Sequence, residues 1–173
     1  MPNRIEKAAS EVMGAVKAAK ATLENLGGVF KQLSREHGEV TALLLIVKMS
    51  SDPKVRRDLF PKIREELLAH EKGELAVVYP AFRGHAELVA YAEMHERDAE
   101  TLERMIGRLG TMAYEDGEWA PMFSELVNHV QQHAKEEEDE FFPLASRILG
   151  KPVCEELNAR YLAKKNAALH GIN

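Results

Sequence analysis

A duplicated pattern of histidine and glutamate constrains this chain more than any other feature of its sequence. Each copy holds a histidine, a glutamate four residues later, and an aromatic-proline pair that starts five residues after the glutamate. The copies are His70, Glu74, Tyr79 and Pro80, and His133, Glu137, Phe142 and Pro143. Residues four apart lie one above the other on a helix, so each copy presents an imidazole and a carboxylate to the same neighbour. Two such helices in one small chain predict a metal site between them.

Composition narrows the classes of partner. A chain of 173 residues with 45% hydrophobic and 29% charged residues is one ordinary globular domain with a real core. Its net charge of -5 gives no electrostatic basis for binding nucleic acid or an anionic membrane. The longest apolar run, Ala42 to Val47, is too short to span a bilayer, and the N-terminus lacks the apolar centre of a secretory signal. We therefore expect no nucleic acid partner, no membrane association and a cytoplasmic location.

The cysteine content excludes two kinds of site. The one cysteine, Cys154, cannot form an intramolecular disulfide. It also cannot hold an iron–sulfur cluster without cysteines from elsewhere. Any metal in this chain is therefore expected on histidine and carboxylate ligands.

Hydrophobic periodicity predicts an all-α fold, because no segment alternates with the period of two expected of a strand. Long helices are predicted over residues 29–49, 53–79, 85–109 and 118–149. Asp52 is the expected N-cap of the second, Pro53 its first residue and Pro80 its end. Four long helices joined by short links indicate an up-down-up-down four-helix bundle.

Glycine-containing breaks divide the chain into three predicted parts. They are an N-terminal accessory helix at 1–28, the bundle at 29–149 and a C-terminal accessory helix at 150–173. The first helix carries a narrow apolar stripe from Ile5 to Leu26 with a period of about 3.5 residues. This stripe would pack on the bundle or form a homodimer.

The spacing of the histidines places four of them at one level of the bundle. At 1.5 Å per residue, His70 and His95 both lie roughly 15 Å from the connection between their helices. His95 and His133 likewise both lie roughly 21 Å from the connection that joins theirs, and His37 falls at the same level within about a turn. A single histidine on an apolar face is usually a core residue with a hydrogen-bond partner. Four at one level, with two carboxylates one turn beyond, favour a metal site.

Six residues are therefore the predicted metal ligands. They are His37, His70, Glu74, His95, His133 and Glu137. Four imidazoles and two carboxylates inside a bundle suit two transition-metal ions, which a carboxylate can bridge. Iron fits this set, and manganese or zinc would be substitutes. In the acidic run from Glu136 to Glu140, Glu137 is the member expected to point inward.

These residues resemble the hemerythrin-like family, the HHE cation-binding domain, over about residues 29–149. The family pattern is a histidine on the first helix, His-Glu-x-x-Glu on the second, a histidine on the third and His-x-x-x-Glu on the fourth. Its counterparts here are His37, His70-Glu71-x-x-Glu74, His95 and His133-x-x-x-Glu137. The resemblance implies the family's bundle and a centre of two non-haem iron ions with an oxo or hydroxo bridge. It also implies a protein that binds or senses O2, NO or iron.

The chain departs from the oxygen-carrying members of that family. They place two histidines four apart on the third helix, where this chain has Tyr91 at the first position. Their last helix carries His-x-x-x-x-Asp, where this chain has Glu137 at spacing four. The position left open would be filled by Glu71, Tyr91, His129 or water. Tyr91 is more often a core aromatic in such a place, and His129 a packing residue.

These departures make simple reversible oxygen carriage less expected than sensing of iron or oxygen, handling of NO or reaction with peroxide. The small partner would be a diatomic ligand or peroxide. The alternative function is a di-iron oxidoreductase, namely a peroxidase, an oxidase or an NO-reducing enzyme. In either case we expect a dry apolar shell around the centre. Its candidate residues are Leu33, Leu44, Leu67, Val78 and Phe141.

Overall fold

The computed structural model describes residues 10, 13–14, 16–17, 20 and 26–171, and the regular structure in this part of the chain is helical throughout. Its elements are α2 (Gly28–Met49), α3 (Pro53–Gly73), the π-helical turn η1 (Glu74–Val78), α4 (Tyr79–Phe82), α5 (Val89–Thr111), α6 (Trp119–Glu136), the π-helical turn η2 (Glu137–Phe141), α7 (Phe142–Leu149) and α8 (Lys151–Leu169). The all-α prediction is confirmed for these residues. None of their helices combines the length and the apolar character that crossing a membrane requires. The helix predicted within residues 1–28, with its stripe from Ile5 to Leu26, lies mostly outside the described residues.

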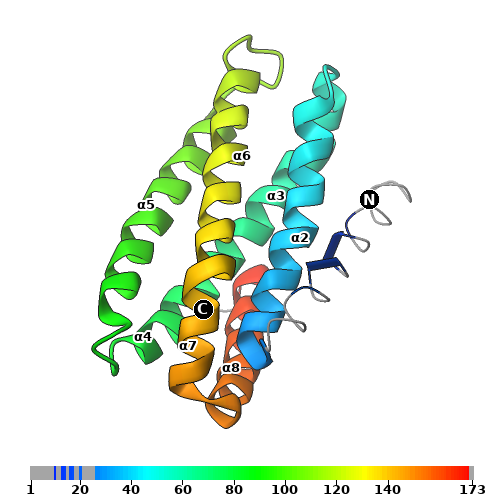
Figure 1. Ribbon diagram of the computed structural model, residues 1–173. Helices are drawn as coiled ribbons and strands as arrows, with labels where there is room; N and C mark the ends of the chain where they lie inside the picture. The colour runs from blue at the N-terminus through cyan, green and yellow to red at the C-terminus, as the bar shows by residue number, and fades with distance from the viewer. Residues whose placement is uncertain (1–9, 11–12, 15, 18–19, 21–25, 172–173) are drawn as a thin grey trace.

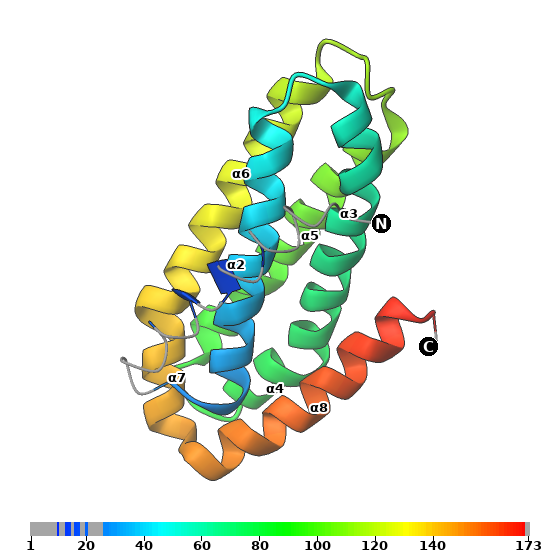
Figure 2. The same ribbon diagram turned by 90° about the vertical axis from the view of Figure 1, so that its right-hand side faces the viewer.

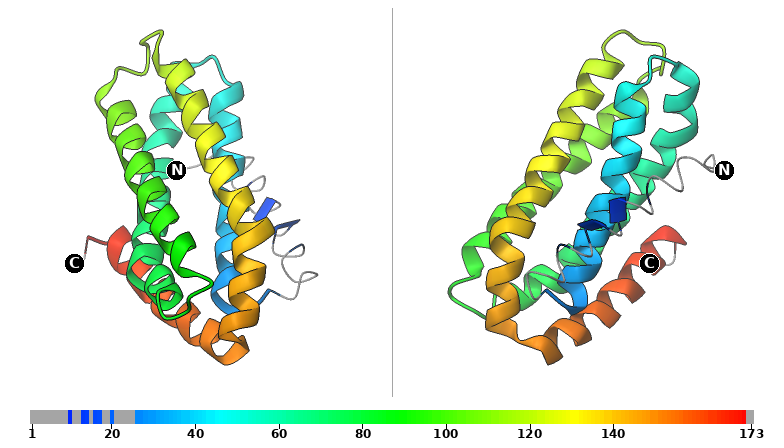
Figure 3. Two further views of the ribbon diagram at one scale, coloured as in Figure 1. Left: turned by 60° about the vertical axis from the view of Figure 1, so that its left-hand side comes forward. Right: turned by 45° about the vertical axis from the view of Figure 1, so that its right-hand side comes forward.

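Four long helices, α2, α3, α5 and α6, lie side by side (Figure 1). The α2–α3 and α5–α6 connections are at one end of this group, and α4 and α7 are at the other (Figures 1 and 3). Helix α8 runs obliquely across α2 and α3 near the α4 end (Figure 2). The four long helices therefore enclose one interior, and α8 covers part of one side.

Local sequence signals explain where two of these helices start. The Asp52 side chain accepts a hydrogen bond of 2.8 Å from the backbone N–H of Lys54, and Pro53 opens α3, so the predicted cap is confirmed. Gly28 opens α2 with a φ of +52°, and a Cβ there would lie 2.3 Å from the backbone carbonyl oxygen of Cys154. Only glycine fits this close approach of α2 to the start of α8.

The prediction that the second long helix ends at Pro80 is wrong. The backbone N–H of Tyr79 bonds to the Glu74 carbonyl five residues back, and α4 carries the helical chain through Pro80 to Phe82. A proline has no N–H, and its ring collides with the carbonyl four residues earlier in a regular α-helix. The wider π turn relieves that collision.

The second copy of the motif behaves in the same way as the first. The backbone N–H of Phe142 bonds to the Glu137 carbonyl, and α7 continues beyond Pro143 to Leu149. Both π turns therefore begin at the glutamate of the repeat and end before its aromatic-proline pair. The repeat encodes this irregular turn as well as the two polar side chains.

The core consists of two apolar clusters with a polar layer between them. One cluster includes Phe30, Phe82 and Leu157, near α4 and α8. The other includes Phe60 and Trp119, toward the α2–α3 and α5–α6 connections. Between the two apolar clusters lie buried histidine and glutamate side chains. They are Glu36, His37, His70, Glu71, Glu74, His95, His133, Glu137 and Glu138.

Candidate metal centre

The four predicted histidines are buried and come from four different helices. His37 on α2 and His70 on α3 have ring centroids 5.1 Å apart, and His95 on α5 and His133 on α6 have centroids 4.7 Å apart. Glu137 connects the two pairs. Its Oε2 lies 3.2 Å from His37 Nε2 and 3.5 Å from His133 Nε2, while its Oε1 lies 3.6 Å from His95 Nδ1. The four histidines that were predicted to lie at one level of the bundle therefore lie close together in the structure.

Unpartnered polar atoms are concentrated in this layer. Among the described residues, eleven buried side-chain nitrogen or oxygen atoms have no hydrogen-bond partner, and eight of them belong here. These eight are Nε2 of His37, His70 and His133, both ring nitrogens of His95, Oε2 of Glu71 and Glu137, and Oε1 of Glu74. Each such atom costs about 1–3 kcal/mol if it stays unpaired. Imidazole nitrogens and carboxylate oxygens are suitable ligands for iron, manganese and zinc, so this donor set fits a metal centre.

The donor atoms of the described residues form three groups, two of which share His133. One group contains atoms of His37, His70 and Glu137, a second contains atoms of Glu71, Glu74 and His133, and a third contains atoms of His95, Asp98 and His133. Within each group the atoms lie within 4.8 Å of one another. The layer therefore offers convergent ligands for a cation, and Glu71 is among them, as the resemblance suggested.

In three of the histidines, the Nδ1 nitrogen lies close to the carboxylate of another helix. His37 Nδ1 lies 2.9 Å from Glu138 Oε1, and His70 Nδ1 lies 2.8 Å from Glu36 Oε2. His133 Nδ1 lies 3.9 Å from Asp98 Oδ2, a longer ion-pair distance. Metal-binding histidines characteristically donate their second ring N–H to such a group, which fixes the tautomer and leaves Nε2 free.

These outer carboxylates were not found by sequence reasoning. Only Glu137 of the run from Glu136 to Glu140 was expected to point inward, but Glu138 is also buried, at 4% exposed, so that expectation is wrong for Glu138. Its side chain fills the contact between η2 and α2, where Oε1 meets His37 and Oε2 meets Lys17 Nζ at 2.9 Å. Adjacent helical residues point about 100° apart, so a ligand and its neighbour can both be buried at a helix–helix contact.

The aromatic residues of the two repeats lie against the histidines. The Tyr79 ring stacks on His95 with centroids 5.2 Å apart, and the Phe142 ring stacks on His37 with centroids 5.9 Å apart. Tyr79 adds a polar contact, because its hydroxyl is 3.1 Å from Glu74 Oε2 and 3.0 Å from Glu137 Oε1. The π turns thus bring the repeat aromatics against the imidazoles.

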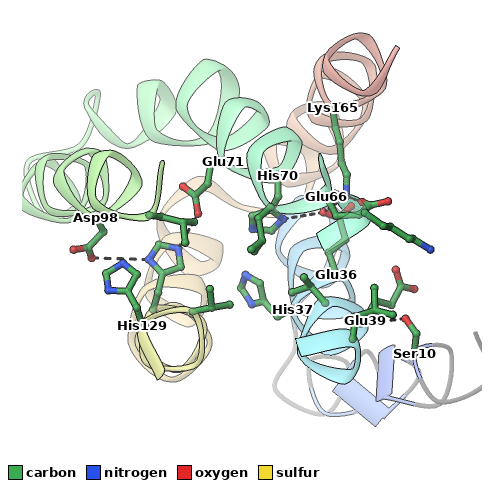
Figure 4. A pocket seen from close by; sticks show the side chains of 17 residues that line it. Ser10, Glu36, His37, Glu39, Glu66, His70, Glu71, Asp98, His129 and Lys165 are labelled. Carbon is green, nitrogen blue, oxygen red and sulfur yellow. Dashed lines mark hydrogen bonds and ion pairs between the residues drawn. The ribbon is translucent and has the colours of Figure 1, made fainter. Parts of the chain in front are cut away.

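The two remaining candidate ligands occupy different places. Tyr91 is half-buried and packs on Phe141 with centroids 4.2 Å apart, which is the position of a core aromatic. His129 is half-buried and lines a cavity beside Asp98 (Figure 4). Neither Tyr91 nor His129 contributes one of the eight unpartnered atoms, whereas Glu71 does.

A cavity of about 70 Å³ adjoins the centre. Its polar wall includes His37, His70 and Glu71 (Figure 4) as well as His133. Its apolar wall comes from α2, α3, α5 and α6. The apolar lining residues are Val40, Leu43, Leu67, Leu102 and Val130. Of the predicted shell residues, Leu67 lines this cavity, while the Phe141 ring contacts His95 at a centroid distance of 4.7 Å. This volume has room for a few water-sized molecules or one diatomic ligand.

Burial and mutual charge perturb the carboxylates of the centre in opposite directions. Burial raises the pKa of Glu71 to about 7 and, together with Glu137, raises that of Glu74 well above its ordinary value. Burial would also raise the pKa of Glu137, but His133 and the neighbouring His37 outweigh it and hold that pKa below its ordinary range. Of Glu71, Glu74 and Glu137, Glu137 is therefore the carboxylate that is ionised most readily.

The imidazoles are shifted by the same interactions. Burial opposes protonation of His37 and His133, but Glu137 and the outer carboxylates raise their pKa values to about 8 and about 9. Burial is the dominant influence on His70 and His95, and it lowers the pKa of both. In the metal-free protein, protons thus occupy part of the donor set that a metal would take.

An all-helical fold around a buried layer of imidazoles and carboxylates defines a class of helical metal-binding proteins. A sequence model of the hemerythrin HHE cation-binding domain matches residues 28–145, more than half of the chain. The chain therefore belongs to the hemerythrin HHE cation-binding domain family.

One similar protein and one negative comparison accompany this match. The chain is 22% identical over 165 residues to a protein of Nostoc sp. (strain PCC 7120) named a DNA nickase. That similarity covers 94% of this chain and 47% of the relative, so the chain spans about half of the relative's length. No solved structure matches.

Proposed function

We propose that this chain is a non-haem di-iron protein of the hemerythrin type that binds or senses O2, NO or iron. Its centre would be ligated by histidine and glutamate inside an up-down-up-down four-helix bundle. The observation that carries the proposal is the convergence of eight unpartnered buried nitrogen and oxygen atoms from four helices. Family membership supports a cation at this place.

Two groups of residues would hold the ions. His37 and His70 would belong to one, and Glu71, Glu74, His95 and His133 to the other. Glu137 approaches histidines of both. A carboxylate in that position is suited to bridge. When bound, the iron pair would supply electrons and an open coordination position for a small ligand.

The chain's own side chains would control access and protons. The apolar wall of the cavity, with Leu43, Leu67 and Leu102, would limit the number of water molecules beside His37 and His70 to a few. The Tyr79 hydroxyl stands between Glu74 and Glu137 and can hold a proton at either carboxylate. Burial raises the pKa of Tyr79 well above its ordinary value, so the phenol stays protonated.

The same hydroxyl favours a second candidate function, a di-iron enzyme that acts on peroxide or NO. Reduction of either substrate consumes protons, and a buried phenol between two carboxylates is a suitable proton holder. This candidate shares the ligands above and differs in turnover. It would be a peroxidase, an oxidase or an NO-reducing enzyme.

DNA nicking is not part of the proposal. That activity is in the name of a relative twice as long as the matched region, and this chain has a net charge of -5. Binding to the DNA backbone depends mainly on basic side chains. Nicking of supercoiled plasmid by the iron-loaded chain would contradict this part of the account.

The experiment that tests the proposal follows the visible absorption of the reduced, iron-loaded protein on addition of air, NO or peroxide. We expect a new band that is stable and that disappears when the ligand is removed, because the protein then binds without turnover. Continuous consumption of peroxide or NO without a stable band would favour the enzyme. No spectral change and no consumption with any of the three would contradict both candidates.

A further inference from the structure

Helix α8 reaches the metal centre from outside the family domain. The family match ends at residue 145, and α8 begins at Lys151. It lies across α2 and α3 (Figure 2), with Tyr161 0% exposed and Lys165 8% exposed. Figure 4 shows Lys165 extending from α8 toward Glu36 and Glu66. Both side chains therefore point into the interior.

One carboxylate oxygen collects the contacts of this helix. Glu36 Oε2 accepts a hydrogen bond of 2.5 Å from the Tyr161 hydroxyl and lies 2.9 Å from Lys165 Nζ. The same oxygen lies 2.8 Å from His70 Nδ1, and the Tyr161 hydroxyl itself lies 3.0 Å from that nitrogen. Glu36 Oε1 accepts a bond of 2.7 Å from Gln32 Nε2. Both oxygens of Glu36 thus have hydrogen-bond partners, and Glu36 fixes the orientation of the His70 ring rather than acting as a metal ligand.

The docking of α8 is built around His70 on α3. Gly73 lies less than one turn beyond His70, and a Cβ there would be 2.5 Å from the Tyr161 ring. Glycine is therefore what allows the ring to reach Glu36. On the other side of His70, Lys165 Nζ lies 3.1 Å from Glu66 Oε2. Contacts of α8 at Glu66 and Gly73 bracket the histidine.

Resting on the metal centre proposed above, we infer that Tyr161 and Lys165 are positioning residues for it. Tyr161 acts on His70 both directly and through Glu36, and Lys165 acts through Glu36. Together they keep the proton of the His70 imidazole on Nδ1 and its Nε2 free toward Glu74, 3.4 Å away. Loss of such an outer contact typically weakens metal binding by about 10–100-fold. The C-terminal helix α8 then contributes two residues that orient a metal ligand.

The test compares Co2+ affinity of the full chain and its variants by titration. Tyr161→Phe removes the hydroxyl but keeps the ring against Gly73, and Lys165→Met removes the charge. Tyr114→Phe at the far end of the bundle and Lys164→Met on the exposed side of α8 are the matched controls. We expect Tyr161→Phe to weaken Co2+ binding about tenfold or more, with both controls unchanged.

A spectroscopic readout separates positioning from a general loss of stability. In the Co2+ protein, each bound imidazole gives a hyperfine-shifted N–H signal in proton NMR. We expect the His70 signal to shift or to exchange faster with water in Tyr161→Phe, while the other imidazole signals stay in place. Glu36→Gln should give the same change, and combining it with Tyr161→Phe should add little, because Glu36, Tyr161 and His70 Nδ1 form one hydrogen-bonded cluster.

The outcomes distinguish this inference from the function on which it rests. Wild-type affinity and an unshifted His70 signal in Tyr161→Phe would overturn the inference and leave the metal centre standing. Fully additive effects of Tyr161→Phe and Glu36→Gln would overturn the route through Glu36. A wild-type chain that binds no Co2+ or iron would overturn the proposed function and this inference together.

Discussion

Tyr79 and Phe142 occupy the same place in the two repeats but offer different chemistry. Both rings stack on a histidine, and the Tyr79 ring also carries the hydroxyl that lies near Glu74 and Glu137. The equivalent edge of Phe142 has no polar group. An aromatic ring therefore stacks on a histidine in both repeats, but only the repeat with Tyr79 places a proton donor beside the carboxylates.

Replacement of Tyr79 by Phe should destabilise the metal-free protein while it keeps its helix content. The two buried carboxylates would lose a partner, which costs about 1–3 kcal/mol in the free energy of unfolding. Urea unfolding followed by circular dichroism measures this. Tyr91→Phe is the control, because Tyr91 is a half-buried packing residue. Equal stability of the two variants would argue against a structural role for the Tyr79 hydroxyl.

Metal uptake near pH 7 should release protons. In the metal-free protein the pKa of Glu71 is raised to about 7, and those of His37 and His133 to about 8 and about 9, so these groups hold protons that ligation removes. Apparent metal affinity should therefore rise with pH up to about pH 9 and level off above it. Calorimetric titration in two buffers of different ionisation enthalpy detects the released protons. Identical heats in both buffers at pH 7 would contradict the prediction.

At the scale of elements, the π turns set the register of the site. Each begins at a repeat glutamate and brings an aromatic ring onto a histidine of another helix. A regular α-helix would turn the residues after Glu74 by a different amount, since the π turn holds one extra residue. The aromatic-proline pair is thus part of the metal centre's architecture.

Replacement of Pro80 by Ala should weaken metal binding without reducing helix content. Alanine restores the missing N–H and removes the ring collision, so η1 can relax to a regular α-helix and displace Tyr79 from Glu74. We expect a loss of affinity of roughly tenfold in a metal titration. Pro121→Ala, in the first turn of α6 and exposed, should bind like the wild type. Equal affinities for both variants would show that the proline does not maintain the turn.

The sequence predicted the parts of the site that follow from helical repeats. His37 and His95 were predicted by counting residues along the helices. The predicted level changes little with small errors in the helix ends, because a turn covers about four residues. Glu36 and Glu138 could not be found in this way, since each is adjacent to a predicted ligand and looks like any charged helix residue. Their burial depends on which helix packs beside them. Tyr161 lies on the predicted C-terminal helix, but its bond to Glu36 depends on the crossing of α8 over α3.

The end of the second long helix was mispredicted for a related reason. Proline usually stops a helix, and Pro80 was interpreted in that way. The backbone instead widens by one residue, a response that neither periodicity nor composition reports. The pairing of Tyr79-Pro80 with Phe142-Pro143 was the available signal for a shared irregularity.

At the scale of the whole molecule, a layer of imidazoles and carboxylates separates two apolar clusters. In a metal-free protein this layer lowers stability, because buried polar atoms lack partners and like charges lie close together. A metal bound in the proposed centre would satisfy the same atoms and link four helices. The bundle and its centre should therefore stabilise each other.

Removal of metal should lower the thermal unfolding temperature. A ligand at 100 times its dissociation constant adds about 2.7 kcal/mol to the free energy of unfolding, which corresponds to a shift of about 5 to 10 °C for a chain of this size. Differential scanning calorimetry before and after chelation measures the shift, and restored metal should reverse it. An unfolding temperature that does not respond to metal would contradict a structural link between the layer and an ion.

The most direct measurement is the iron content of the purified, anaerobically reconstituted chain beside that of Glu74→Gln, His70→Ala and a control, His85→Ala. We predict two irons per chain in the wild type and in His85→Ala, and fewer in the other two variants, since His70 and Glu74 contribute unpartnered atoms to the centre. Two irons per chain retained in both His70→Ala and Glu74→Gln would contradict the assigned ligands. A wild-type chain without iron after reconstitution would contradict the metal centre itself.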